Sequence, residues 1–149
     1  MRKKTAVDVA LHFLKFRPRT GFEIERKLRQ KKFLPQQISQ TIELLKKEDL
    51  INDLEFAKMW IENRNSLSPR GSKLLFLELR RLGVNTEICQ QALAQDNSSE
   101  LEKAKTVLKQ KKKIYRQLPP EKFRQKMIRL LAARGFSWDT IREVLHSPA

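Results

Sequence analysis

Residues 10–17 read ALHFLKFR, and the pattern returns at a fixed interval of 47 residues as AKMWIENR (residues 57–64) and AKTVLKQK (residues 104–111). Each copy begins with an alanine, has an aliphatic residue four positions later and ends in a cation. A separation of four residues places the alanine and the aliphatic side chain on one face of a helix. The pattern therefore predicts three equivalent helices, each with a small and a large apolar residue on its buried face.

A second echo follows each of these stretches. It consists of a leucine, an apolar residue five positions later and an isoleucine four or five positions beyond that: Leu28, Phe33 and Ile38; Leu79, Val84 and Ile88; Leu131, Phe136 and Ile141. The distance from the alanine to the leucine grows from 18 to 22 to 27 residues. We expect the loop between the first two helices to absorb this growth, because loop-closure entropy rises only logarithmically with length.

These echoes predict one unit written three times, in residues 1–50, 51–97 and 98–149. Residues that favour helix ends divide each unit into three helices: the capping-box sequence Thr20 to Glu23, the expected N-caps Asn52, Ser68, Asn85 and Ser99, Pro35 for a first turn, and Gly83 for a positive φ. No run alternates with period two, so strands are not expected. The predicted fold class is all-α, with three tandem three-helix repeats in an elongated, curved arrangement.

Composition supports a folded protein. The 149 residues are 40% hydrophobic, with only 4 Gly and 6 Pro. A unit of about 45 residues has a marginal core, so we expect neighbouring units to pack together and most aromatic residues to be core. The single cysteine, Cys89, excludes an intramolecular disulfide, and the longest apolar run, Leu74 to Leu77, is too short to span a bilayer. We expect a cytoplasmic monomer without a membrane partner.

The net charge of +15 is unevenly distributed. Lys and Arg outnumber Asp and Glu by 13 to 6 in residues 1–50 and by 13 to 5 in residues 99–149, but the counts are 6 and 6 in residues 51–98. A positive field of this size attracts polyanions or an acidic protein surface. The charge alone does not decide between these partners.

The candidate partner-binding residues are cations of the first and second helices of each unit. They are Arg17, Arg26, Arg29, Lys32, Arg64, Arg70, Lys73, Arg80, Arg81, Lys111, Lys112, Lys113 and Arg116. The run of lysines from Lys111, with Tyr115 nearby, has two interpretations. It could hold a phosphate backbone while the ring stacks on a base, or it could be a solvated helix end whose cations complement the helix dipole.

No motif indicates an enzyme. His12 and His146 are isolated, and Cys89 has no neighbouring histidine in the sequence. There is no zinc-ligand spacing, no glycine-rich phosphate loop and no nucleophile elbow. We therefore expect no catalytic residue, no metal and no cofactor.

The central unit resembles a known family. Residues 50–57 (LINDLEFA), followed by Arg64, Gly71 and Gly83-Val84, are similar to the signature of the RecX regulators of the RecA recombinase, as are Arg17, Arg19, Thr20, Glu23 and Leu28 before them. The resemblance spans about residues 6–95 and is weaker beyond. It implies three three-helix units that lie along the groove of the RecA–DNA filament. Binding there restrains filament growth and so lowers strand exchange, ATP turnover and coprotease activity.

The alternative is a tandem helix-turn-helix protein that binds DNA through phosphate contacts. Reading bases requires Arg, Lys, Asn or Gln that reach from the third helix of a unit into the major groove. Residues 85–95 hold no cation, Lys46 and Lys47 fall at the distal end of their helix, and Arg142 lies among acidic residues. This distribution favours non-specific contact with DNA phosphate, or with an acidic protein face, over base readout.

Overall fold

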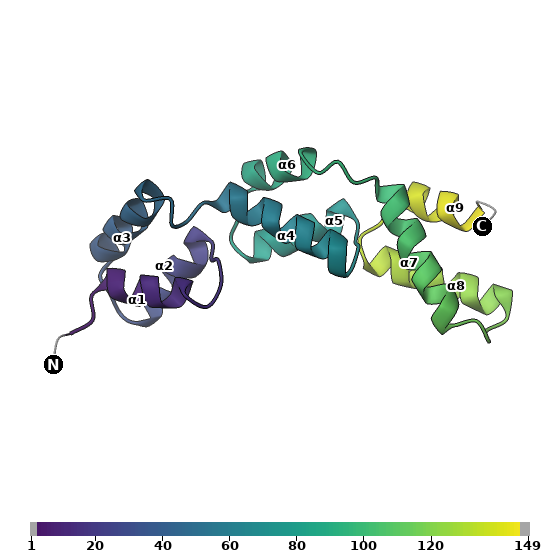
Figure 1. The fold of residues 1–149 in the computed structure, drawn as a ribbon, viewed down its shortest axis with the longest axis horizontal. Coiled ribbons are helices and arrows are strands. Elements are labelled where there is room, and N and C mark those ends of the chain that lie inside the picture. The colour runs from purple at the N-terminus through teal and green to yellow at the C-terminus, as the bar shows by residue number, and fades with distance from the viewer. Residues whose placement is uncertain (1–2, 147–149) are drawn as a thin grey trace.

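Helices account for all the regular structure in residues 3–146, the part of the chain that the computed structural model describes. They form three groups of three along an elongated, curved chain (Figure 1). The helices are α1 (Ala6–Leu14), α2 (Gly21–Gln30), α3 (Pro35–Lys47), α4 (Asp53–Leu67), α5 (Ser72–Arg81), α6 (Thr86–Ala94), α7 (Glu100–Ile114), α8 (Pro120–Ala133) and α9 (Trp138–His146). The predicted all-α class is confirmed.

Each group of helices has its own hydrophobic cluster. Ala10, Ala57 and Ala104, which begin the three repeated stretches, are completely buried, and each lies in a different cluster. The three leucines of the second echo are completely buried as well. An alanine at this position allows the second and third helices of the unit to approach the first one closely, since no larger side chain intervenes.

Most of the aromatic residues that the sequence analysis assigned to the core lie there. Phe56 and Phe136 are buried, and five others pack against the clusters while partly exposed: Phe13, Phe33, Trp60, Phe76 and Phe123. Phe22 and Trp138 are exposed, so the expectation of a core position is wrong for them.

The growth of the repeat lies in the helices and not in the loop, so that expectation was wrong. The first helix has 9 residues in the first unit and 15 in the other two, and the second helix lengthens from 10 to 14 residues in the third. The connections 15–20, 68–71 and 115–119 remain short. Each residue added to an existing helix makes its own backbone hydrogen bond, whereas a loop residue does not.

Most of the expected helix caps are present. Thr20 and Glu23 form a capping box, Pro35 begins α3, and Asn52, Asn85 and Ser99 each accept a bond from the third residue of a helix. Ser68 is the exception, because it ends α4 and Gly71 is the N-cap of α5. A Cβ on Gly71 would lie 2.1 Å from the carbonyl oxygen of Gly135. The close approach of the third unit therefore requires a glycine at the N-cap of α5, a position for which local preference favours residues such as serine.

The second helices of successive units meet end to end. At the first junction the hydroxyl of Thr20, the N-cap of α2, donates to the carbonyl of Leu82, the C-cap of α5, at 2.6 Å. At the second junction the N–H of Gly71 donates to the carbonyl of Arg134, the C-cap of α8, at 2.8 Å. The units pack together as expected, but largely through helix ends. Each hydrophobic cluster is centred on one group of helices, although Ile51, which precedes α4, belongs to the cluster of the first unit.

A carboxylate reinforces each junction in the same way. Asp53, the first residue of α4, accepts a bond of 3.0 Å from the N–H of Gly21, and Glu100, the first residue of α7, accepts one of 3.2 Å from the N–H of Ser72. Both donors are the first residue of a second helix. A negative charge there complements the positive end of the helix dipole. The two junctions are therefore copies of one design, which repeats with the unit.

Glycine is required at both junctions for two reasons. Gly83 and Gly135 follow α5 and α8 with φ of 89° and 83°. A Cβ on Gly83 would lie 2.1 Å from the Cβ of Phe22, and one on Gly135 would lie 2.6 Å from the Cβ of Leu74. The equivalent residue after α2 is Lys32, which has the same left-handed backbone (φ 66°) and an exposed side chain.

Candidate binding surface

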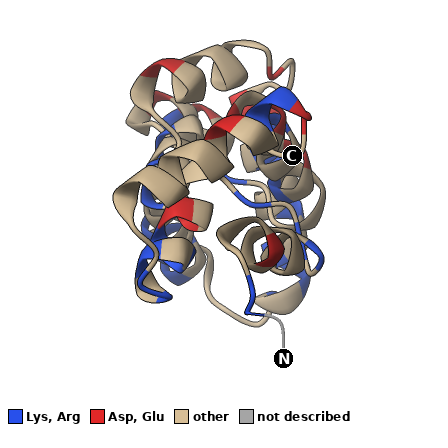
Figure 2. Cartoon of the chain, turned by 90° about the vertical axis from the view of Figure 1, so that its left-hand side faces the viewer, with Lys and Arg blue, Asp and Glu red and all other residues tan. Residues whose placement is uncertain are grey.

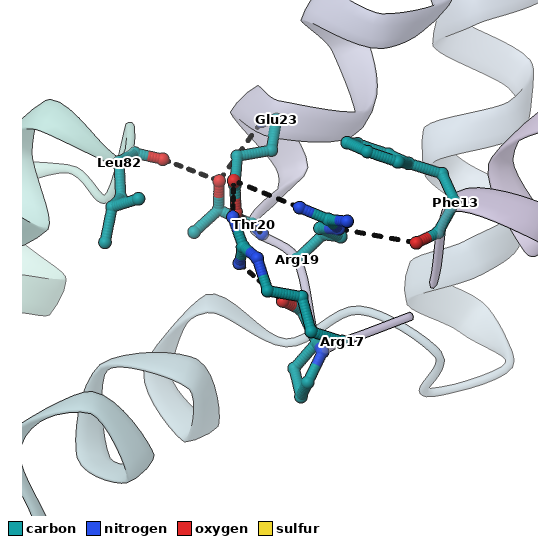
Figure 3. A network of polar contacts seen from close by, with 7 residues as sticks. Phe13, Arg17, Arg19, Thr20, Glu23 and Leu82 are labelled. Atoms are coloured by element: carbon teal, nitrogen blue, oxygen red, sulfur yellow. Dashed lines mark hydrogen bonds and ion pairs between the residues drawn. The ribbon is translucent and has the colours of Figure 1, made fainter. Parts of the chain in front are cut away.

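The first junction is built from a polar network that involves the segment before α2 (Figure 3). The carboxylate of Glu23 accepts from Arg17 and, at 3.1 Å, from the N–H of Thr20. Arg19 lies on its other side, with its guanidinium 3.8 Å from the centre of the Phe13 ring and its Nε donating to the Phe13 carbonyl at 3.3 Å. Burial, with a smaller contribution from Arg17, lowers the pKa of Arg19, and Glu23 opposes the shift. The network fixes the approach of α1 to α2.

The same junction brings cations from two units together around a hollow of about 350 Å³, here called the junction hollow. Arg26 of α2 and Arg81 of α5 line it, next to the exposed ring of Phe22. Both arginines are exposed, and neither has an ion-pair partner among the described residues. Their charge is therefore available to a partner.

Seven of the thirteen predicted cations share this condition. They are exposed and have no ion pair or hydrogen bond to a carboxylate within residues 3–146: Arg26, Lys32, Lys73, Arg81, Lys112, Lys113 and Arg116. They are distributed over all three units. Their role in binding stays a prediction.

The other six are engaged within the protein. Arg17 pairs with Glu23, Arg29 with Glu25, Arg64 and Arg70 with Glu78, Arg80 donates to the Val84 carbonyl, and Lys111 lies 5.9 Å from the centre of the Tyr115 ring.

Glu78 is the centre of the most enclosed of these groups. It pairs with Arg70, whose side chain is only 15% exposed and which also donates to the Ser68 carbonyl at 3.0 Å. Arg64 lies 4.4 Å from the centre of the Trp60 ring, and the indole N–H donates to Glu78 at 3.3 Å. Arg70 therefore has little surface to offer a partner.

Tyr115 is already covered by cations. Lys126 of α8 lies 4.4 Å from the ring centre, in addition to Lys111. A base that stacks on this ring would have to displace an ammonium group. The contact also identifies a set of cations that the sequence interpretation left out, those of α8: Lys122, Arg124, Lys126 and Arg129. The sequence repeat could have identified these cations as candidates, since α8 is the second helix of its unit, as α2 and α5 are of theirs.

The third helices offer few cations. Figure 2 looks along the long axis of the chain, and α6, the uppermost helix, carries Glu87 and no lysine or arginine. In α9, Arg142 donates to Asp139, and in α3, Lys46 and Lys47 lie in the last turn. Base readout by these helices is disfavoured, as the sequence indicated.

The described residues also contain no arrangement that supports catalysis by metal or thiolate. Within residues 3–146 no group of three or more His, Cys, Asp and Glu side chains could hold a metal ion. Cys89 is buried, and burial raises the pKa of its thiol, opposite to the change that makes a cysteine nucleophilic. In the same range no helix is both long enough and apolar enough to cross a membrane.

Comparison with known proteins decides the family. The models of the first, second and third three-helix domains of RecX match residues 6–45, 52–93 and 98–145 in that order. The chain belongs to the RecX family. The third match extends the RecX assignment beyond residue 95, where the resemblance in sequence was weaker. All three matches coincide with the three groups of helices.

Individual RecX proteins are similar along most of the chain. The regulatory protein RecX of Finegoldia magna is 29% identical over 142 residues, which cover 93% of this chain and 69% of that protein. The regulatory protein RecX of Streptococcus sanguinis is 31% identical over 131 residues, 88% of this chain and 50% of that protein. The chain thus spans between half and about two thirds of these relatives. The crystal structure of RecX from Lactobacillus salivarius matches 94% of this chain and 92% of its own with a TM-score of 0.81 at 28% identity.

Proposed function

We propose that the protein regulates the RecA recombinase by lying along the groove of the RecA–DNA filament and restraining its growth. Restrained growth lowers ATP hydrolysis, strand exchange and coprotease activity together, since all three depend on the assembled filament. The observation that carries the proposal is the pair of equivalent end-to-end junctions, which join the three RecX units into one elongated chain.

A repeated, elongated binder suits a repeated, elongated partner. After one unit binds, the other two are held at a high effective concentration beside the next subunits of the polymer, so modest contacts add up. Junctions that already fix the angle between units reduce the ordering that binding requires. Three units in one chain supply this avidity without oligomerisation, which supports action as a monomer.

The available cations supply the complementary charge. The seven unpaired residues spread over the three units face a partner that contains DNA, and contacts with phosphate release counterions and weaken steeply with salt. Direct non-specific contact with DNA in the filament is part of this proposal. It predicts little preference among DNA sequences, because α6 carries no lysine or arginine and Arg142 of α9 is held by Asp139.

The test follows RecA ATP hydrolysis on single-stranded DNA as the protein is titrated. We expect inhibition, and inhibition at far less than one copy per RecA would indicate that filament ends are the target. The double variant Arg26→Glu and Arg81→Glu reverses the charge of both arginines at the junction hollow and should raise the concentration for half-inhibition at least tenfold. Lys46→Glu with Lys47→Glu, an equal change of charge at the end of α3, is the matched control.

Two results would contradict the proposal. One is unaltered ATP hydrolysis at a several-fold excess of the wild-type protein. The other is equal loss of inhibition in both double variants, because this would reduce the effect to total charge.

A further inference from the structure

A broad groove in the first unit shares only Lys32 with the cations that the function proposed above uses. It lies between α1 and α3 and has a volume of about 1290 Å³. Val9, Phe13 and Leu44 contribute its apolar surface, and the lysines around it are Lys3, Lys4, Lys27, Lys31 and Lys32. Among residues 3–146, no aspartate or glutamate lines it. The groove is therefore both apolar and strongly positive.

The groove reflects a departure of the first unit from the repeat. α1 makes less contact with α3 than α4 makes with α6 or α7 with α9. α1 is also six residues shorter than its equivalents α4 and α7. The first unit thus leaves a larger space beside its first and third helices than the second unit, where the hollow beside α4 and the end of α6 measures about 440 Å³.

Large apolar side chains are exposed at the groove. Phe16 is 70% exposed, and its ring is held edge-on by His12 at a centroid distance of 5.2 Å. Leu44 is exposed on the opposite wall. Contiguous exposed apolar surface rimmed by polar residues marks interaction sites.

The size and shape of the groove point to a helix as the occupant. The volume exceeds the roughly 300–1,000 Å³ of small-molecule pockets. The 9 residues of α1 extend about 13 Å, which accommodates a little more than two turns of a partner helix with apolar anchors three or four residues apart.

A nucleic acid strand is the less favourable occupant. Bases bind by stacking on open aromatic faces. Here the Phe13 ring is covered by Arg19 at 3.8 Å and by Lys27 at 5.2 Å. This leaves the exposed ring of Phe16 for a base, and Val9 and Leu44 beside it are aliphatic. We propose that the α1–α3 groove binds an acidic amphipathic helix of a partner protein, with its apolar face on Phe16 and Leu44 and its carboxylates beside the lysines.

The test uses a fluorescein-labelled 14-residue peptide with leucines at positions 3, 6, 7 and 10 and mainly glutamate and alanine elsewhere, titrated with the full chain and followed by anisotropy. A peptide of the same composition with the leucines scrambled, and a 15-nucleotide oligothymidylate, are the comparison ligands. We expect the amphipathic peptide to bind at least tenfold more tightly than the scrambled one. Amide chemical shifts should change in α1 and α3 and not in α7 to α9.

Two variants locate the site. Phe16→Ser should weaken the amphipathic peptide about tenfold, and Lys3→Glu with Lys31→Glu should weaken it further. Leu67→Ser, at an 81% exposed residue outside the groove, should leave affinity unchanged. Equal affinity for the scrambled peptide, tighter binding of the oligothymidylate that depends on Phe16, or an unchanged affinity in both groove variants would each overturn the proposal. None of these measurements involves RecA, so they are independent of the filament role.

Discussion

Thr20 donates its hydroxyl proton to the carbonyl oxygen of Leu82 across 2.6 Å, although 62 residues separate the two in sequence. The same hydroxyl oxygen accepts from the N–H of Glu23 at 3.1 Å, and the Thr20 side chain is completely buried. One side chain therefore caps α2 and joins the first unit to the second. A local capping signal that sequence alone can identify is here also a contact between units.

Thr20→Val should destabilise the protein by roughly 2–3 kcal/mol. The substitution removes a helix cap, which contributes about 0.5–2 kcal/mol, and leaves a buried carbonyl without its donor, which costs about 1–3 kcal/mol. Urea unfolding monitored by circular dichroism measures the change. Thr20→Ser keeps the hydroxyl and loses one methyl group, so about 1 kcal/mol is expected. Equal losses in the two variants would show that the methyl group and not the hydroxyl is responsible.

Gly83→Ala and Gly135→Ala should each destabilise the protein by at least about 1–3 kcal/mol, the cost of a left-handed backbone at a residue other than glycine. The added methyl group also meets Phe22 or Leu74 within 2.6 Å, so the junction has to open. Small-angle X-ray scattering should report a changed maximum dimension. Lys32→Gly, at the equivalent backbone position after α2, is the control, and its stability should stay within about 1 kcal/mol of wild type. A similar response at all three positions would mean that the junctions play no part.

The repeat and its core were predictable because helical periodicity acts locally. Ala10, Ala57 and Ala104 are buried where a period of 3.6 residues places them, and the caps at Thr20, Asn85 and Ser99 follow from side-chain chemistry within one turn. Where a residue contacts another unit, capping preferences taken from the local sequence give the wrong position. Gly71 takes the N-cap that Ser68 was expected to fill, because the backbone of Gly135 lies against it.

The binding surface was less predictable than the fold. Arg70 and Arg81 belong to the same cluster of cations in the sequence, yet Arg70 is held by Glu78 and Arg81 is unpaired beside Arg26. The packing of α4 and α5 decides which arginine lies close enough to a carboxylate to form an ion pair. The geometry of the junction decides which arginine lies beside the next unit. Neither follows from charge or periodicity alone. Asp53 and Glu100, which stand at equivalent positions 47 residues apart and each accept from the N–H of a second helix, are a junction signal that the sequence did contain.

Acid should weaken the connection between α6 and α7. Asp96 accepts from the buried Lys103 at 2.8 Å and from the N–H of Ser98 at 3.0 Å. Burial raises the pKa of Asp96, but these bonds outweigh it, so the net pKa lies below its usual value of 3.8. The stabilisation is thus fully present above the unfolded pKa and is lost as pH falls through the folded one.

Asp96→Asn should therefore destabilise the protein at pH 7 by roughly 3 kcal/mol, because it leaves the Lys103 ammonium buried without its partner. The gap between variant and wild type should close as the pH falls below the usual carboxyl pKa of 3.8 and through the lowered pKa of Asp96. Asp139→Asn, at a 90% exposed ion pair with Arg142, should change stability by no more than about 0.5 kcal/mol at pH 7. A difference for Asp96→Asn that stays constant while the pH falls from 7 through the range in which the wild-type carboxylate is protonated would contradict the assignment to the carboxylate.

Substitutions of Arg70 and Lys73 should have different effects, although the two residues lie only three positions apart. Arg70 is expected to stabilise the fold, and Lys73 is expected to bind the partner. Arg70→Ala removes a 15% exposed partner of Glu78 and a bond to the Ser68 carbonyl, so we expect a loss of roughly 1–3 kcal/mol, a fall in Tm of about 5 °C. Inhibition of RecA ATP hydrolysis should be unchanged at temperatures where the variant is folded.

Lys73→Glu, at an exposed and unpaired side chain, should leave Tm within about 1–2 °C of wild type, because surface substitutions rarely change stability by more than about 0.5 kcal/mol. It should instead raise the concentration for half-inhibition several-fold. The opposite pattern, with Arg70→Ala defective in inhibition at full stability, would place the buried arginine on the binding surface and remove Lys73 from it.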